Sequence, residues 1–314
     1  MMYLEAKSRV RKGYVSLSIA VLSLFCFSGM ANSQVNVKKE AMVLVEAVQI
    51  KSPSAIKVAF IDSNFSGVEV ADFLGSLETY DVATDSTEGV TENIVTQQGS
   101  VLAENNNHGT KVLREFMAEY KSLKGGYAPN ILLVKISTGK DAEGKVSSTR
   151  VAAGIRYATN HGAKVINISL GTLQQTKNTL EAIEYARSHG VIVVAASGNW
   201  GEDKNVPKKT MSVYAQAPGV VAVGAMDDNG IIASYTSGVG NGKLQFVART
   251  RFGTGTSLAS PVVAADVVGI LEENINSSTD DNANGKWDIM EIENALIDGM
   301  QNKYFSVKAV EMAS

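Results

Sequence analysis

Short apolar segments alternate with helical patterns through the middle of this 314-residue chain, and this alternation restricts the fold more than any other feature. Four apolar runs are predicted as strands: residues 131–136, 165–170, 191–196 and 219–225. Helical patterns at 147–160 and 177–188 separate the first three strands, and each ends before a glycine, Gly162 or Gly190. Strands joined by right-handed helical crossovers build a parallel sheet. We therefore expect an α/β fold, with a doubly wound, mostly parallel sheet and helices on both faces.

Polar residues stand where two of the predicted strands end. An earlier apolar strand, residues 56–61, runs directly into Asp62, and Asn199 follows the strand 191–196 after a Ser-Gly turn. Residues 63–105 are polar and show no clear periodicity, so we expect this region to be rich in loops. Functional groups of such sheets gather beyond the carboxyl ends of the strands. Asp62 and Asn199 are therefore expected at one edge of the sheet.

A polar turn at residues 252–261 leads into the apolar run 262–271, which is typical of a buried helix. Glycines 253 and 255 supply unusual backbone angles, Thr256 or Ser257 can cap the helix, and Pro261 is tolerated near the first turn. Free N–H groups and the helix dipole would stabilise an oxyanion formed by attack of Ser257 on a carbonyl. Taken alone, Ser257 is better explained as a helix N-cap, so the nucleophile hypothesis depends on the partners that the rest of the chain supplies.

Three histidines are candidates for the base that such a nucleophile needs. His161 and His189 each lie in the last turn of a predicted helix before glycine, where the dipole favours a partly positive imidazole. His108 instead begins the helical pattern that runs to residue 123, where the dipole disfavours a cation. An acid must compensate, and Asp62 can supply it.

These residues predict a triad with Ser257 as nucleophile, His108 as general base and acid, and Asp62 orienting the imidazole. The order Asp, His, Ser differs from that of the α/β-hydrolases. The Gly253-x-Gly255 pattern occurs too late in the chain for a dinucleotide-binding loop.

Four motifs surround these residues: Ile61-Asp62-Ser63, Asn107-His108-Gly109-Thr110, Ala196-Ser197-Gly198-Asn199 and Gly255-Thr256-Ser257-Leu258-Ala259-Ser260-Pro261. They resemble the motifs of the subtilisin-like serine proteases, in the order of that family, and the resemblance extends over about residues 56–300. The resemblance implies an endopeptidase that forms an acyl-enzyme on Ser257, with Asn199 donating to the oxyanion. It also implies that the strand exit Ser169, Leu170 and Gly171 pairs with an extended polypeptide substrate. Considered individually, Asn199 is better explained as an ordinary turn residue, and residues 169–171 as an ordinary strand exit with no role in binding.

The sequence departs from the family pattern at several positions. Asn64 stands where glycine is usual, Lys111, Leu113 and Arg114 replace a histidine and small residues, and the segment 246–251 lacks an Ala-Pro-Gly turn. These departures leave an alternative from another class, a catalytically inactive subtilisin-fold binding module. A narrow processing protease or a transacylase is the alternative within the enzymes.

The first 33 residues have the pattern of an export signal. Four basic residues between positions 7 and 12 precede an apolar run at 14–30, and Ala31-Asn32-Ser33 offers small residues before a cut at Gln34. A retained membrane anchor is the alternative, although the run is short. Cys26, the only cysteine, lies inside this signal, which excludes cysteine catalysis in the exported protein. We expect a periplasmic or secreted protein with no membrane contact after cleavage.

Two further segments complete the predicted organisation. Residues 34–55 form a short N-terminal segment that is too short for a folded pro-domain, and residues 56–314 form the peptidase domain. The net charge is −3 and no long basic run occurs, so nucleic acid is not an expected partner. The sequence does not indicate an oligomeric state.

Residues 280–291 fit a twelve-residue, EF-hand-like calcium loop. Gly285 would provide the bend, and the predicted Ca²⁺ ligands are Asp280, Asn282, Asn284, Lys286 through its carbonyl, Asp288 and Glu291. The alternative is a solvated turn in which Asp288 caps a following helix. The ion would be structural, and catalysis would need neither metal nor cofactor.

Overall fold

The computed structural model describes residues 56–66, 68, 76–91, 108–124, 129–137, 146–174, 176–274, 292, 294–295 and 305–306. All of them belong to one compact unit, Lys51–Ser314. The predicted signal and the segment 34–55 lie outside the described residues. Their boundaries stay predictions.

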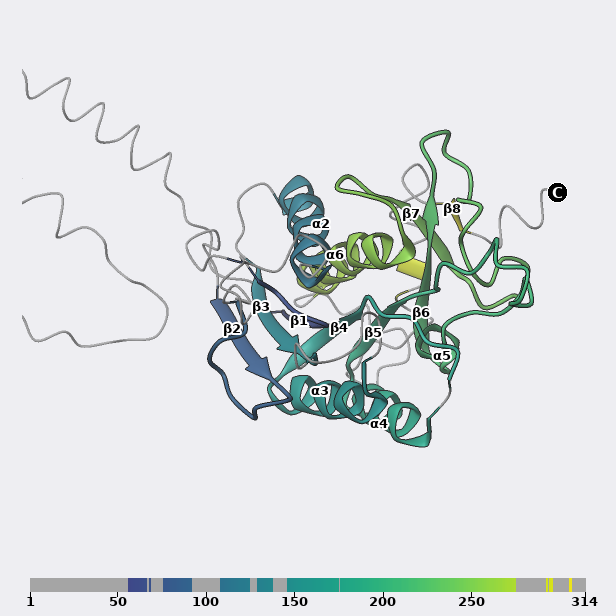
Figure 1. The fold of residues 1–314 in the computed structure, drawn as a ribbon. Coiled ribbons are helices and arrows are strands. Elements are labelled where there is room, and N and C mark those ends of the chain that lie inside the picture. Colours follow the sequence, from purple (N-terminus) through teal and green to yellow (C-terminus); the bar gives the residue numbers. More distant parts are fainter. Residues whose placement is uncertain are drawn as a thin grey trace, which may run out of the picture. The chain divides into compact units, whose positions relative to one another are not determined.

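Within the described residues, seven parallel strands form one sheet (Figure 1). The strands are β1 (Lys57–Asp62), β2 (Ser76–Asp81), β3 (Asn130–Lys135), β4 (Ala163–Ile168), β5 (Ile192–Ala196), β6 (Val220–Met226) and β7 (Phe246–Arg249). A short strand β8 (Phe305–Ser306) adds to the edge antiparallel to β7, and the order is β2-β3-β1-β4-β5-β6-β7-β8. Because β3 and β4 flank β1, the chain crosses over β1 between them, and the site lies near this crossover.

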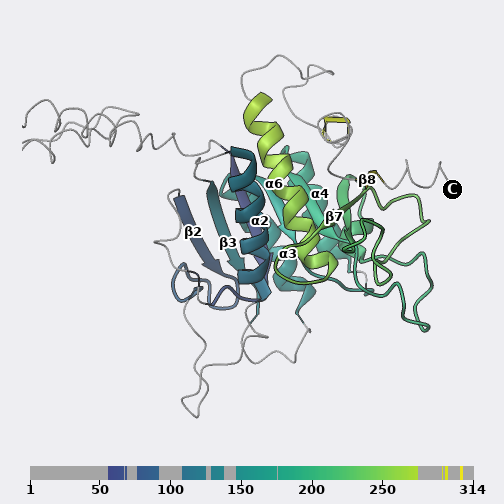
Figure 2. The same ribbon diagram turned by 90° about the horizontal axis from the view of Figure 1, so that it is seen from above.

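Helices cover both faces of the sheet (Figures 1 and 2). On one face lie α2 (His108–Lys124) and α6 (Thr256–Asn274), which pack side by side. The other face carries α3 (Ser148–Asn160), α4 (Lys177–Ser188) and the short α5 (Val213–Gln216). The prediction of a doubly wound α/β fold is confirmed.

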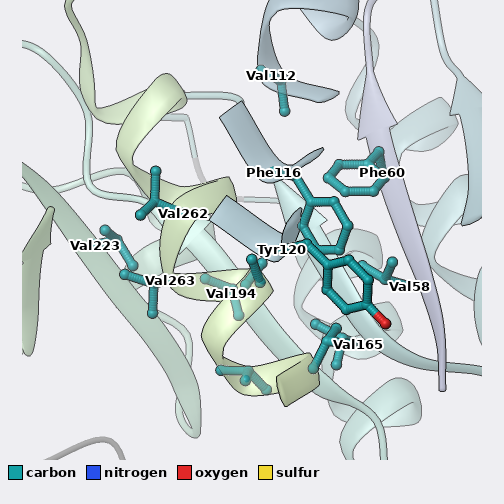
Figure 3. Close-up of a cluster of buried hydrophobic side chains, with 14 of the residues drawn as sticks. Val58, Phe60, Val112, Phe116, Tyr120, Val165, Val194, Val223, Val262 and Val263 are labelled. Carbon is teal, nitrogen blue, oxygen red and sulfur yellow. The ribbon is translucent and has the colours of Figure 1, made fainter. Parts of the chain in front are cut away.

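The strand β1 shows how the sequence builds two cores. Its side chains alternate, so that Val58 and Phe60 join the cluster under α2 and α6, whereas Ala59 and Ile61 join the cluster under α3 and α4. Figure 3 shows the first cluster, where the ring of Phe116 meets Phe60 edge-on with centroids 5.0 Å apart. A strand buried on both faces needs a continuous apolar run, which is why β1 is easily recognised.

The region 63–105 was expected to be rich in loops, and the strand β2 within it was not predicted. β2 lies within it and pairs in parallel with β3. It is the edge strand, and most of its side chains are only partly buried. An edge strand is held by backbone hydrogen bonds and needs no apolar run, so the sequence SLETYD gives no strand pattern. The short strands β7 and β8 were not predicted either.

Candidate active site

Asp62 and His108 meet at the carboxyl end of β1. Asp62 is the last residue of β1 and is fully buried, and His108 is the first residue of α2. The imidazole Nδ1 lies 2.8 Å from one carboxylate oxygen and 3.0 Å from the other. The backbone N–H and the hydroxyl of Ser63 also donate to this carboxylate. The geometry leaves Nε2 as the ring nitrogen that can exchange a proton, on a side chain that is 35% exposed.

The charge of Asp62 controls the basicity of the ring. The carboxylate raises the pKa of His108 above its ordinary value of 6.5, and its hydrogen bond to the ring adds to this effect. Burial and the nearby Lys111 ammonium act in the opposite direction without cancelling it. Asp62 therefore stabilises the imidazolium that forms when His108 accepts a proton.

The first turn of α2 is fixed against the loop that follows β1. A Cβ atom on Gly109 would lie 2.3 Å from the carbonyl oxygen of Asn64, so only glycine fits there. The hydroxyl of Thr110 donates to the carbonyl of Ser66 at 2.8 Å. Asn64 does not need the left-handed angles of the usual glycine, because Asp85 is the one non-glycine residue with positive φ in the described part of the chain.

Ser257 lies in the first turn of α6, as predicted. The turn before it contains Gly253 and Gly255, with φ of 151° and 129°. Asn199 is bound to the same turn, because its side-chain oxygen accepts hydrogen bonds from the N–H and the hydroxyl of Thr256 at 2.9 and 3.0 Å. This leaves its Nδ2 free of the turn. A Cβ on Gly255 would lie 3.5 Å from both Asn199 Nδ2 and Ser257 Oγ, so the amide nitrogen and the hydroxyl both lie close to Gly255.

A buried polar network joins β4 to the start of α6. Pro261 has no N–H, so the carbonyl of Ser257 lacks its partner in the helix, and the hydroxyl of Ser169 donates to it instead at 2.7 Å. Asn167 donates to the Ser169 hydroxyl, and Ser260 donates to Asn167, both at 2.8 Å. The hydroxyl of Ser169 therefore contacts the helix of the candidate nucleophile.

The sequence analysis missed this network, although Pro261 inside a helix was a signal that one carbonyl needs another donor.

Ser169, Leu170 and Gly171 were predicted to pair with substrate. All three follow β4, which ends at Ile168. Their pairing would use the backbone, and it stays a prediction.

Two fully buried glutamates of α2 hold the segment between β7 and α6. The carboxylate of Glu115 accepts the N–H of Arg251, at 2.8 and 3.0 Å from its two oxygens, and the N–H of Phe252 at 2.6 Å. Glu119 forms an ion pair of 2.6 Å with the guanidinium of Arg251. Sequence reasoning missed both glutamates. They explain how this segment is held without an Ala-Pro-Gly turn.

The two remaining histidines have structural roles. His161 and His189 are the C-cap residues of α3 and α4. Each Nδ1 lies within hydrogen-bond distance of a carbonyl of the last helical turn, Tyr157 at 2.8 Å and Tyr185 at 2.7 Å. Neither ring is part of the candidate triad.

The predicted calcium loop, residues 280–291, lies outside the described residues. Among the residues that the structure does describe, no group of three or more His, Cys, Asp or Glu side chains could hold a metal ion. Within these described residues, no helix has the length and apolarity needed to cross a membrane.

Comparison with known proteins places this geometry in a family. Residues 53–303 match the model of the subtilase family. The chain is 32% identical to Subtilisin DY of Bacillus licheniformis over 180 residues, 54% of this chain and 64% of that protein. Subtilisin BL of Lederbergia lenta is 34% identical over 181 residues, again 54% of this chain and 64% of the relative.

Solved structures show the same fold. A cold-adapted subtilisin-like serine proteinase superimposes with a TM-score of 0.58 at 20% identity, covering 77% of this chain and 81% of that one. The matched stretches thus span just under two thirds of the two Bacillus and Lederbergia relatives. With a family model that covers most of its length, this chain belongs to the subtilase family.

Proposed function

We propose that this protein is a serine endopeptidase that hydrolyses peptide bonds through an acyl-enzyme on Ser257. The observation that carries the proposal is the contact of the buried Asp62 with His108 at the start of α2. Helix α2 packs against α6, whose first turn holds Ser257 beside Asn199. Both helices follow parallel strands and begin at the carboxyl edge of the sheet. The kinship with serine proteases of the subtilase family supports the same activity.

The chemistry assigns one role to each side chain. The hydroxyl of Ser257 attacks the carbonyl carbon while its proton moves to Nε2 of His108, and Asp62 stabilises the resulting imidazolium. The negative oxygen is stabilised by the N–H of Ser257 and by Nδ2 of Asn199. When the C–N bond breaks, His108 returns the proton to the leaving amine. A water molecule, deprotonated by His108, then releases the acid and restores Ser257.

The substrate is proposed to be an extended polypeptide that adds as a strand to the exit 169–171. This segment leaves β4 next to β5, whose own exit carries Asn199. Main-chain pairing at a sheet edge binds a peptide with little dependence on its sequence. Side-chain preferences must then come from the groups around the two exits.

Export is the second part of the proposal and rests on the sequence alone. Cleavage of a signal after Ser33 would leave Gln34 as the first residue of a periplasmic or secreted enzyme. Mass spectrometry of the exported protein tests this, and an intact N-terminus on the exported chain would reject it.

The segment 280–291 is proposed to bind a structural Ca²⁺.

A fluorophosphonate probe tests the catalytic proposal directly, because it labels only an activated serine. We expect labelling of the wild-type protein at Ser257, none of the Ser257→Ala variant, and cleavage of casein by the wild type alone. Folded wild-type protein that shows neither labelling nor casein cleavage would instead support the inactive binding module.

A further inference from the structure

The ring of Trp200 lies between two strand exits beside the candidate nucleophile. Strands β4 and β5 are neighbours, so the segments that follow them, 169–171 and 197–199, leave the sheet next to each other. A Cβ on Gly171 would lie 2.9 Å from Cη2 of the indole, and a Cβ on Gly198 would lie 2.2 Å from Cζ3. Consecutive atoms of the six-membered ring thus contact one exit and then the other.

The backbone around Trp200 is fixed. Its N–H donates to the hydroxyl of Ser237 at 2.8 Å, and the N–H of Gly201 donates to the carbonyl of Tyr235 at 2.9 Å. A Cβ on Gly201 would lie 2.5 Å from two carbonyl oxygens of the segment 234–236, so the two segments are in close contact. The indole cannot leave its place by a shift of this backbone.

The same space is where a substrate side chain must begin. A carbonyl attacked by Ser257, with its oxygen near Nδ2 of Asn199, has its own Cα about 1.5 Å from the carbonyl carbon. If the preceding residues pair with 169–171, that Cα lies between Asn199 and Gly171. Trp200 follows Asn199 directly and contacts Gly171. The indole therefore occupies room that a large side chain on the acyl side of the cleaved bond would need.

The geometry points to Trp200 as a specificity-determining residue that restricts the acyl-side residue of the substrate to glycine, alanine or serine. This inference rests on the proposed peptidase function. The physical cause is steric, because a large side chain would have to displace a ring whose backbone is held on both sides. The effect should fall on both binding and reaction, since the excluded side chain prevents the carbonyl from reaching Ser257.

The test compares peptides that differ only at the acyl-side residue, with glycine, alanine, leucine or phenylalanine at that position. For the wild type we expect kcat/KM for alanine to exceed that for phenylalanine by ~100-fold or more. Trp200→Ala should reduce this preference by a similar factor through faster cleavage after phenylalanine, and Trp200→Phe should lie between. Ile231→Ala, which removes an exposed apolar side chain elsewhere, should keep the wild-type preference.

The rate of fluorophosphonate labelling at Ser257 separates the possible failures, because this probe has no acyl-side residue. Variants that label like the wild type are folded, and an unchanged preference in them would overturn the role of Trp200 while the peptidase function stands. A wild type that cleaves equally well after phenylalanine and alanine would overturn it too. Absence of labelling in every protein would remove the proposed function and this inference with it.

Discussion

The hydroxyl of Ser169 donates a 2.7 Å hydrogen bond to the carbonyl of Ser257. In a regular helix this carbonyl would accept from the N–H of residue 261, but Pro261 has none. The bond connects the end of β4 with the first turn of α6. The position of the candidate nucleophile is thereby set by the sheet as well as by its own helix.

Ser169→Ala should leave this carbonyl and part of the Asn167 amide without a partner in a buried site. We expect the free energy of unfolding to fall by about 1–3 kcal/mol, and labelling of Ser257 to slow because its turn can shift. Urea denaturation and labelling kinetics measure the two effects. In Ser188→Ala, where the lost hydroxyl is exposed, stability should change by less than ~0.5 kcal/mol. Equal behaviour of the two variants would argue against the tether.

Glu115→Gln should loosen the segment before Ser257. The amide that replaces the carboxylate has one acceptor oxygen in place of two and no charge, yet faces the same N–H donors of Arg251 and Phe252. We expect a loss of about 1.5–3 kcal/mol in the free energy of unfolding, with slower labelling and a lower kcat at nearly unchanged KM.

The matched control for Glu115 is Glu184→Gln on α4, which breaks an exposed ion pair with Arg187. Exposed pairs contribute about 0–1 kcal/mol, so this variant should resemble the wild type in stability and labelling. If Glu115→Gln also resembles the wild type, the buried carboxylate does not hold the segment.

The pH dependence of labelling should follow His108. Its pKa is raised by Asp62, and the base must be neutral to accept the proton, so the rate should fall as the pH drops through a midpoint above 6.5. Asp62→Asn removes the negative charge, so this midpoint should move to lower pH, and the maximal rate should drop by ~10⁴-fold. A rate profile whose midpoint is the same in both proteins would contradict the assignment.

The pair of Asp62 and His108 also makes the free energy of unfolding depend on pH, in the direction opposite to that of the labelling rate. Because the pKa of His108 is higher in the folded than in the unfolded protein, the pair stabilises the fold most below the unfolded pKa. This contribution is lost as the pH rises through the folded value. Urea denaturation at several pH values should show it in the wild type and show less of it in Asp62→Asn.

Calcium should raise the melting temperature if the loop 280–291 binds it. At one hundred times its dissociation constant, an ion bound only to the folded state adds about 2.7 kcal/mol to stability. We expect a chelator to lower the melting temperature of the wild type, and Glu291→Gln to weaken the effect. A transition that is identical with and without calcium would reject this site.

The sequence predicted those parts of the molecule that depend on local patterns. The strand β1 was recognised from its continuous apolar run and the helix α4 from its helical pattern. The contact of Asp62 with His108 was inferred because the start of a helix disfavours an unpaired imidazolium. The edge strand β2 carries no such pattern. The contact of Glu115 with Arg251 joins positions 136 apart, and no local rule reveals the partner of a buried carboxylate.

That separation along the chain also affects when the segment before Ser257 becomes ordered during folding. Glu115 and Glu119 cannot bind Arg251 until the strands between them in the chain have assembled into the sheet. A chain that is fully synthesised but only partly folded would therefore carry Ser257 without the carboxylates that hold the preceding segment. On the proposed function, Ser257 would become fully reactive only when the sheet and α2 have assembled around the segment before it.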